Sequence, residues 1–317
     1  MTAIRQIYEA CASHFIPSLL RSLDHVINLT CREMDSADWD ALLFILKHGD
    51  SVKLNLLWTS IPAEQIKFLV FTLDRVSQLS VDKDVLLKLV HYCAAYDAQQ
   101  GAAVSLLRTL QHCLDLSCSS CVDLVQREPL RLSANDCRDI STILTHSCQD
   151  TRLILQDCEV EDSGLDLLFP VLDRVRLQAS KAILLQLMSL IPSYSERDRV
   201  RRAVSLCRAL AGELDLSHTT LPQSAFVALV LMLDGCEELV ELDLSHCQLT
   251  DQLLDTLSPH LHKVQVLDLS HNNITDASTD QLIKLVSSNP FIRTVRIFSN
   301  KILDRASFKK HRQFEIW

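Results

Sequence analysis

The sequence is poor in glycine, with only 5 among 317 residues, and this shortage excludes several kinds of site. A GxxxxGKS/T phosphate loop, a GxGxxG dinucleotide loop and a GxSxG nucleophile turn all need glycines at fixed spacings. The glycines present supply none of these spacings; they are Gly49, Gly101, Gly164, Gly212 and Gly235. We therefore expect no nucleotide-binding loop of these types in the chain.

Long hydrophobic runs are also missing. The longest uninterrupted one extends from Ala225 to Leu233, whereas about 20 residues are needed to cross a bilayer. The first residues, MTAIRQIYEACASH, lack the basic start and apolar centre of a signal peptide. The net charge of −9 argues against a broad footprint on nucleic acid. These features predict a cytoplasmic protein with no membrane and no nucleic acid among its partners.

Cysteine is too sparse for a disulfide scaffold, and we interpret the 12 cysteines as reduced, mostly buried thiols. Cys118 and Cys121 lie near His112, so a zinc or redox site is an alternative, but a second ligand pair is missing. The sequence has no HExxH motif, and no Ser, His and Asp set is distinguished as a nucleophile with its base. We expect no catalytic residues, metal or cofactor, and hence no enzyme. A hydrolase or metal enzyme on the same scaffold is the alternative of another class.

Leucine, by contrast, is abundant, and the 57 leucines follow a repeat. The pattern L-x-L-x-x-N/C-x-L recurs at intervals such as 23, 25, 27 and 28 residues, which are typical of leucine-rich repeats. The copies are LDLSHCQL (242–249), LDLSHNNI (267–274), LILQDCEV (153–160), LRLSANDC (130–137), LDLSHTTL (214–221), VRIFSNKI (295–302), LNLLWTSI (54–61) and the weaker INLTCREM (27–34).

Each copy predicts a strand, a turn and a helix. The L-x-L alternation gives a short strand with one buried face, and an amphipathic segment of helical period follows the turn. The turn position suits a small buried residue that can bond backbone groups. Its predicted occupants are Asn135, Asn272 and Asn300, with Cys158, Cys247, Thr59 and Thr219 as substitutes. A single unit cannot bury its apolar face alone, so neighbouring units must stack.

A longer period overlies the short one. AVSLLRTLQHCLDLS (103–117) matches AVSLCRALAGELDLS (203–217) at ten of fifteen positions, which predicts a duplicated block of about 100 residues. Each block contains one long segment with two helical stretches in place of one. The predicted organisation is a helical cap at 1–25, a solenoid at 26–304 with blocks at 26–125 and 126–212 and regular repeats at 213–304, and a tail at 305–317.

The predicted fold is therefore an α/β leucine-rich-repeat solenoid. We expect a horseshoe with one parallel sheet on the concave face and helices on the convex face. The predicted strand centres lie near residues 28, 55, 78, 115, 131, 154, 176, 215, 243, 268 and 296.

The repeat units, with their long helical second halves, resemble the ribonuclease-inhibitor type of leucine-rich repeat over about 26–304. The LDLSH units and the ending FKKHRQFEIW (308–317) resemble the C-terminal repeats of NACHT-and-leucine-rich-repeat (NLR) proteins, especially the fish set. This resemblance implies a protein-interaction scaffold that senses a ligand or regulates a cytosolic innate-immune protein. A missing nucleotide-binding domain of the same protein is then an implied partner. A free-standing, ribonuclease-inhibitor-like stoichiometric inhibitor of a basic enzyme stays open as the alternative.

The concave face is the surface on which we expect a protein partner. Its main feature is a ladder of Asp, Ser and His at equivalent positions of three repeats: Asp215, Ser217 and His218, then Asp243, Ser245 and His246, then Asp268, Ser270 and His271. The ladder is either an acidic stripe for a basic partner or an inert, solvated strand sequence, and its imidazoles could offset the acidic charge or bind a metal. Earlier strands would present Trp58 and Arg131, residue types common in binding hot spots, unless Trp58 is buried under the following turn.

Overall fold

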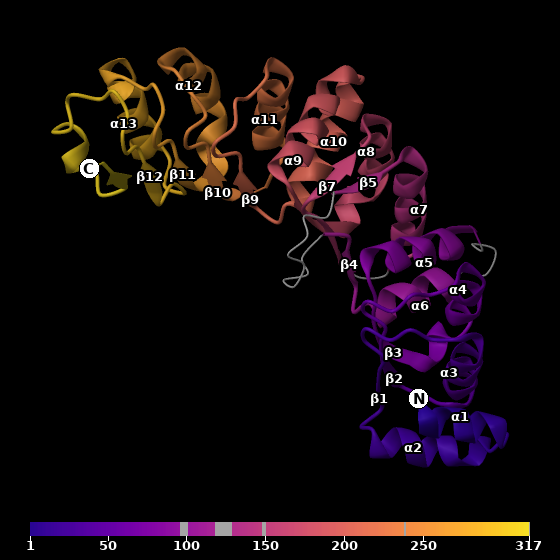
Figure 1. Ribbon diagram of the computed structural model, residues 1–317. Coiled ribbons are helices and arrows are strands. Elements are labelled where there is room, and N and C mark those ends of the chain that lie inside the picture. The colour runs from indigo at the N-terminus through magenta and orange to yellow at the C-terminus, as the bar shows by residue number, and fades with distance from the viewer. Residues whose placement is uncertain (96–100, 118–128, 148–149, 238, 317) are drawn as a thin grey trace. The chain divides into compact units, whose positions relative to one another are not determined.

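The computed structural model describes residues 1–317 except 96–100, 118–128, 148–149, 238 and 317. The chain divides into two compact units, Met1–Gln178 and Ala179–Trp317. In each unit, parallel strands alternate with helices along the chain (Figure 1).

Every predicted strand centre lies within a strand. The N-terminal unit contains β1 (Val26–Asn28), β2 (Val52–Asn55), β3 (Val76–Ser80), β4 (Cys113–Asp115), β5 (Leu130–Leu132), β6 (Thr151–Leu155), β7 (Cys158–Val160) and most of β8 (Val175–Ala179). The C-terminal unit contains β9 (Glu213–Asp215), β10 (Leu239–Asp243), β11 (Val264–Asp268), β12 (Thr294–Arg296) and β13 (Phe314–Glu315). Strands β7 and β13 were not predicted.

The helices follow the strands as the repeat pattern predicts. The N-terminal unit has α1 (Thr2–Glu9), α2 (Ile16–Ser22), α3 (Ser36–His48), α4 (Ala63–Val70), α5 (Lys83–Ala95), α6 (Gly101–Thr109), α7 (Ala134–Thr145) and α8 (Asp162–Leu168). The C-terminal unit has α9 (Lys181–Leu190), α10 (Glu196–Ala209), α11 (Gln223–Gly235), α12 (Asp251–Leu257) and α13 (Thr279–Ser288). The remaining helices are short 3-10 turns: η1 (Ser13–Phe15), η2 (Leu73–Arg75), η3 (Phe169–Arg174), η4 (Ile191–Ser193), η5 (Ser258–Lys263), η6 (Asp276–Ser278) and η7 (Phe308–Lys310).

The internal duplication is visible in the order of these elements. Strand β3 is followed by two helices, α5 and α6, and then by β4. About 100 residues later, β8 is followed by α9 and α10 and then by β9. The two-helix segments therefore occur where the long period of the sequence predicts them.

The predicted single sheet is wrong, because the described strands form four separate sheets: β1-β2-β3, β4-β6-β8, β5-β7 and β9 to β13 in chain order. The pairs with a defined register are all parallel, as predicted. Strand β4 pairs directly with β6, so the strand near 131 is not inserted between them. It pairs instead with β7 in a small sheet of its own.

The cause lies in the residues that follow β5. Ser133 accepts a hydrogen bond from the backbone N–H of Asp136 and Asp136 accepts one from that of Ser133, forming a capping box that begins α7 at once. No repeat turn is made, and the prediction that Asn135 bonds backbone groups inside such a turn is wrong. Asn135 lies in the first turn of α7, where its Oδ1 accepts from Arg138.

The two ends of the chain pack against the neighbouring repeats. Arg5 of α1 makes ion pairs with Asp35 and Asp38, at the start of α3. The backbone N–H of Asp38 and the Arg5 guanidinium together lower the pKa of Asp35. At the other end, Phe308 is fully buried and β13 pairs with β12. The tail therefore contributes a strand to the last sheet.

In several repeat turns, one side chain joins consecutive repeats. Asn272 Nδ2 donates to the carbonyl of Leu244 in the preceding repeat, at 2.8 Å, and to that of Leu269 in its own, at 2.9 Å. Its Oδ1 accepts from the backbone N–H groups of Cys247 and Leu249, at 3.1 and 2.9 Å. One amide thus satisfies several backbone groups in a site from which water is excluded.

Four other predicted turn residues also donate to a carbonyl of a preceding repeat, but with fewer hydrogen bonds than Asn272. Asn300 Nδ2 donates to Leu269 O at 2.8 Å, Cys247 Sγ to Leu216 O at 3.0 Å, Cys158 Sγ to Leu116 O at 3.2 Å and Thr59 Oγ1 to Leu29 O at 2.8 Å. In each case the acceptor is the residue that directly follows an earlier strand, namely β11, β9, β4 and β1 in turn. Thr219 differs, because its hydroxyl bonds Leu216 O within its own turn.

We expect Asn272→Ala to lower the free energy of unfolding by about 3 kcal/mol, because it leaves buried N–H and C=O groups without partners. The measurement is urea unfolding followed by circular dichroism. Asn273→Ala is the matched control, since the Asn273 side chain takes no part in these bonds, and it should cost less than about 0.5 kcal/mol. Equal losses for the two variants would contradict the role given to Asn272.

Candidate functional site

The sheet β9 to β13 has one face covered by helices and one that carries polar side chains. Helices α11, α12 and α13 lie on the covered side (Figure 1), where Leu214, Leu242, Leu267 and Val295 stand in register and are at most 2% exposed. The alternate residues point the other way. We call these the open face: Glu213, Asp215, Glu241, Asp243, Val266, Asp268, Thr294, Arg296 and Glu315.

Strand register brings the predicted Asp residues into one row. Asp215 is the register partner of Asp243, and Asp243 is the partner of Asp268. The row continues with Arg296 and Glu315. Because adjacent strands lie about 4.8 Å apart, like charges in such a row repel one another.

Two cations that the sequence analysis missed stand at the two ends of the Asp row. Lys181 Nζ, from α9, lies 2.9 Å from Asp215 Oδ1 and also donates to Ser217 O at 2.7 Å. Arg296 Nη1 lies 3.6 Å from Asp268 Oδ2 and 3.1 Å from Glu241 Oε1. In the VRIFSNKI copy of the repeat, Arg296 takes the position of the aspartates, so its place in the row could have been predicted from the repeat alignment. Lys181 lies in a two-helix segment outside the repeat pattern, and no local signal indicates its position.

These contacts leave two carboxylates of the open face without a paired cation. Among the residues that the structure describes, Glu213 and Asp243 make no ion pair. Partial burial acts to raise the pKa of Asp215, but the hydrogen bonds from Lys181 and Ser217 outweigh it and lower that pKa. The open face therefore carries an excess of carboxylates, with its cations at the two ends of the row.

The Asp side chains also hold the turns that follow the strands. Oδ1 of Asp215, Asp243 and Asp268 accepts the backbone N–H of the Ser two residues later, at 2.8 to 2.9 Å. Asn28 and Asn55 make the same turn in the N-terminal unit with a neutral amide oxygen, each at 3.1 Å. The turn thus needs the oxygen but not the negative charge.

The three histidines form a stack beside the Asp row. The ring centroids of His218 and His246 are 4.0 Å apart, and those of His246 and His271 are 4.1 Å apart. All three residues have φ between 55° and 59°, a left-handed conformation that directs the exposed rings out of the turn. Loss of solvent within the stack, and then the charges of the two neighbouring rings, lower the pKa of His246.

The serines of the ladder are not exposed, although the sequence analysis placed them on the concave surface. Ser217 and Ser270 are 7% and 4% exposed, and Ser245 is half-buried. They follow the Asp into the turn, where Ser270 Oγ accepts the backbone N–H of Phe298 at 3.3 Å. The other ladder residues are more accessible: the three histidines and Asp215 are exposed, and Asp243 and Asp268 are half-buried.

Trp58 and Arg131 do not share a surface row. Trp58 occupies the turn position that corresponds to His246, with φ 55° and 38% exposure, so it is not buried under the following turn. Its backbone N–H donates to Asp82 Oδ2 at 2.7 Å. Arg131 lies on β5 and pairs with Glu159 of β7 at 2.9 Å. Trp58 follows β2 and Arg131 lies on β5, and these strands belong to separate sheets, so the two side chains do not continue one row.

Further findings concern metals and membranes. Across the described ranges, no three His, Cys, Asp or Glu side chains are arranged to hold a metal ion. Cys118 and Cys121 lie outside the described residues. Of the helices that the structure describes, none is both long and apolar enough to span a membrane.

We expect the pKa of His246 to lie below the ordinary value of 6.5, because the stack removes solvent from the central ring and places its charge between two other imidazoles. The unfolded chain then binds more protons, so His246 makes the fold less stable as the pH falls below 6.5. NMR titration of the ring protons measures this pKa directly. His271→Asn should raise the pKa of His246, and a midpoint at or above 6.5 in the unsubstituted protein would contradict the effect of the stack.

Comparisons with known proteins identify the repeat. A leucine-rich repeat model matches residues 238–259, and a second one matches residues 260–278. The comparison with curated proteins finds no match. The matched segments contain β10, α12, β11 and the ladder residues of two repeats. These matches support a leucine-rich repeat protein, and such repeats are in general modules of protein interaction.

Proposed function

We propose that the chain is a non-enzymatic interaction scaffold whose open face binds a basic segment of a protein partner. The observation that carries this proposal is the charge on the strand-end turns. Asn28 and Asn55 make the same turn without charge, yet the row of the last sheet has Asp215, Asp243 and Asp268. Folding alone does not require those charges, and their mutual repulsion opposes it.

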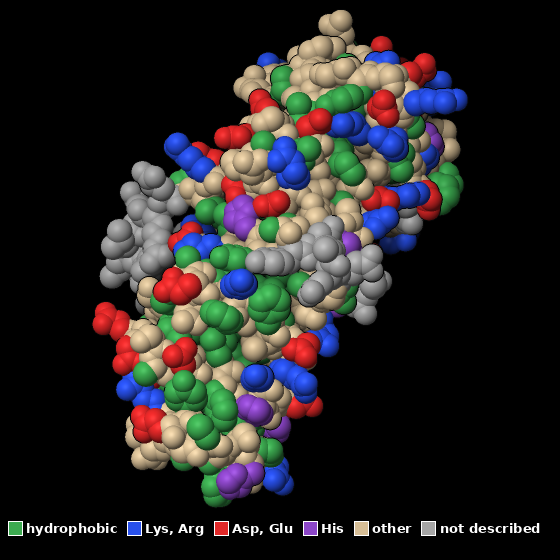
Figure 2. All heavy atoms as spheres, turned by 90° about the vertical axis from the view of Figure 1, so that its right-hand side faces the viewer, with side chains coloured by type: hydrophobic (Ala, Val, Ile, Leu, Met, Phe, Trp, Pro, Cys, Tyr) green, Lys and Arg blue, Asp and Glu red, His purple; other side chains and the backbone are tan. Residues whose placement is uncertain are grey.

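The arrangement of the carboxylates suits an extended basic segment. Glu213 and Glu241 are register partners one row beside the aspartates, so the acidic groups extend along the strands as well as across them. A lysine or arginine that enters between two carboxylates relieves their repulsion and gains its own attraction. By contrast, acidic and basic side chains are interspersed on the face that Figure 2 draws.

The family resemblance suggests a biological setting. We infer that the chain is the ligand-sensing or autoregulatory repeat region of an NLR-like cytosolic innate-immune protein. The LDLSH units of 242–246 and 267–271 and the ending 308–317 support this inference. Its partner is then either a foreign or signalling protein, or the nucleotide-binding domain of the same protein. The nine described cysteines, all free thiols, suit a reducing, cytoplasmic location.

A stoichiometric inhibitor of a basic enzyme is the second candidate. The acidic open face favours it, because an extended acidic surface attracts a basic enzyme and speeds its association. On this alternative the solenoid acts alone and encloses its target on the concave side of a horseshoe.

The first test removes charge from the open face without changing its turns. Glu213→Gln with Asp243→Asn keeps the oxygen of residue 243 that accepts the turn N–H. The double variant should weaken binding of a lysine- and arginine-rich peptide about fivefold, measured by fluorescence anisotropy. The single change Asp243→Lys should weaken it further. Affinity should fall as salt is raised.

The matched control is Asp255→Asn with Asp280→Asn, which changes the net charge equally on α12 and α13. Both side chains are exposed on the helical side. The control should bind the peptide as the unsubstituted protein does. Equal weakening in the two double variants would show that the peptide responds to net charge and not to the open face.

An inhibition assay separates the two candidate functions. A ribonuclease-inhibitor-like protein should abolish the activity of its basic nuclease at equimolar concentration, and Asp243→Lys should weaken that inhibition. For an NLR-like repeat region we expect full nuclease activity at the same concentration. The assay covers a set of basic nucleases. Equimolar inhibition of any one of them would overturn the NLR-like inference in favour of the inhibitor.

A further inference from the structure

The row of stacked histidines continues into a position that has no ring. The backbone N–H of His246 donates to the carbonyl of Ser270, which precedes His271, at 3.0 Å. That of His271 donates in the same way to the carbonyl of Phe298, which precedes Ser299, at 2.7 Å. The φ of Ser299 is 52°, close to the 55° to 59° of the three histidines. Ser299 is therefore the next member of the row.

His271 has a stacked neighbour on one side of its ring. Its plane lies at 10° to that of His246, at a centroid distance of 4.1 Å. Among the described residues, no ring stacks on the opposite side, and the hydroxymethyl group of Ser299 is too short to cover it. Both His271 and Ser299 are exposed. We call the space beside Ser299, against the uncovered side of the His271 ring, the end slot.

The size of the end slot suits one planar group. Neighbouring strands place equivalent residues about 4.8 Å apart, and the histidine rings fill that spacing at centroid distances of 4.0 and 4.1 Å. A ring supplied by another molecule would continue the row above Ser299, parallel to the other rings. Stacking of aromatic rings adds to the gain from removing their surface from water.

The charges near the end slot favour an uncharged ring over a guanidinium. Arg296 lies three residues before Ser299, and its register partners are Asp268 and Glu315. Its guanidinium lies 3.6 Å from Asp268 Oδ2 and 3.3 Å from Glu315 Oε2. A cation is thus already paired with the carboxylates of both neighbouring strands, and a second cation beside it would be repelled. An aromatic ring in the end slot meets no such repulsion.

We propose that the basic segment of the partner carries an aromatic side chain, which stacks on His271 in the end slot. This inference rests on the proposed function, because the carboxylates of the open face hold the basic residues of the same segment. The ring supplies an anchor at one end of the row, and aromatic side chains are the residue type that most often dominates a binding surface.

The distance between the two contacts defines the order of residues in the partner. Asp243, which has no paired cation among the described residues, lies on β10, two strands before β12. Two strand spacings are about 10 Å, and an extended chain advances about 3.3 Å per residue. The segment should therefore carry its aromatic residue about three positions from a lysine or arginine.

The first test compares two lysine- and arginine-rich peptides that differ only in having a tyrosine or an alanine at that position. Fluorescence anisotropy with the full chain should give about fivefold tighter binding of the tyrosine peptide, the gain typical of one aromatic pair. Equal affinities would overturn the end slot and leave the proposed binding of basic segments intact. If neither peptide binds, the proposed function fails and this inference fails with it.

A variant that fills the end slot tests its location. Ser299→Leu covers the His271 ring with a side chain that is not planar, and it should reduce the difference between the two peptides to less than about twofold. Ser299→Ala is the matched control, because it leaves the end slot open and should keep the fivefold difference. An unchanged difference in Ser299→Leu would place the tyrosine elsewhere. Circular dichroism checks that both variants fold.

NMR of the unsubstituted protein provides a measurement that does not depend on the variants. The ring current of a stacked tyrosine should shift the His271 ring protons when the tyrosine peptide is added, and the alanine peptide should shift them much less. His218 is the internal control, because it ends the stack on the other side. Shifts of equal size at His218 and His271 would contradict the assignment of the tyrosine to the end slot.

Discussion

The hydrogen bond from a buried turn side chain to the carbonyl of the preceding repeat is the contact on which the rest of the structure depends. Asn272, Asn300 and Cys247 make it in the C-terminal unit, and Thr59 and Cys158 make it in the N-terminal unit. It fixes the register of consecutive strands, because each turn can reach only one carbonyl of its neighbour. Residues that stand the same number of positions before this side chain in successive repeats are then neighbours in space. This produces both the row of aspartates and the stack of histidines.

The stacking of identical positions has an electrostatic consequence that differs with residue type. In the Asp row, the charges repel, and Lys181 and Arg296 offset this only at the two ends. In the His stack, the central ring loses affinity for its proton. Apolar positions have no such conflict, so Leu214, Leu242 and Leu267 pack at less than 3% exposure. An uncharged open face would be easier to fold, which is why its carboxylates are the strongest indication of a partner.

The sequence predicted those parts of the fold that depend on spacing alone. Strand positions, the two-helix segments and most turn residues follow from the leucine period. The prediction failed where one segment is compatible with two local structures, a repeat turn and the start of a helix. LRLSANDC fits the repeat, but Ser133 and Asp136 also form a capping box, and the helix started by that box removed Asn135 from the turn. The contacts of Lys181 could not be predicted for another reason. Lys181 lies in a two-helix segment outside the repeat pattern, so the pattern does not indicate which residues it faces.

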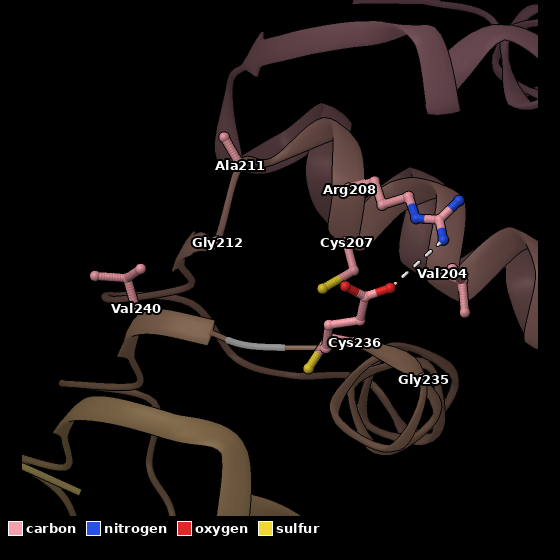
Figure 3. Close-up of a pocket in the computed structure, with 9 residues that line it drawn as sticks. Val204, Cys207, Arg208, Ala211, Gly212, Gly235, Cys236 and Val240 are labelled. Carbon is pink, nitrogen blue, oxygen red and sulfur yellow. Dashed lines mark ion pairs between the residues drawn. The ribbon is translucent and has the colours of Figure 1, made fainter. Parts of the chain in front are cut away.

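The contact between α10 and α11 shows why contacts between the helices of neighbouring repeats are the hardest to predict. Cys207 and Cys236 are 29 residues apart, and neither belongs to the L-x-L pattern. They line one pocket (Figure 3) because α10 and α11 pack closely at Gly235, a contact set by helix geometry and not by strand register.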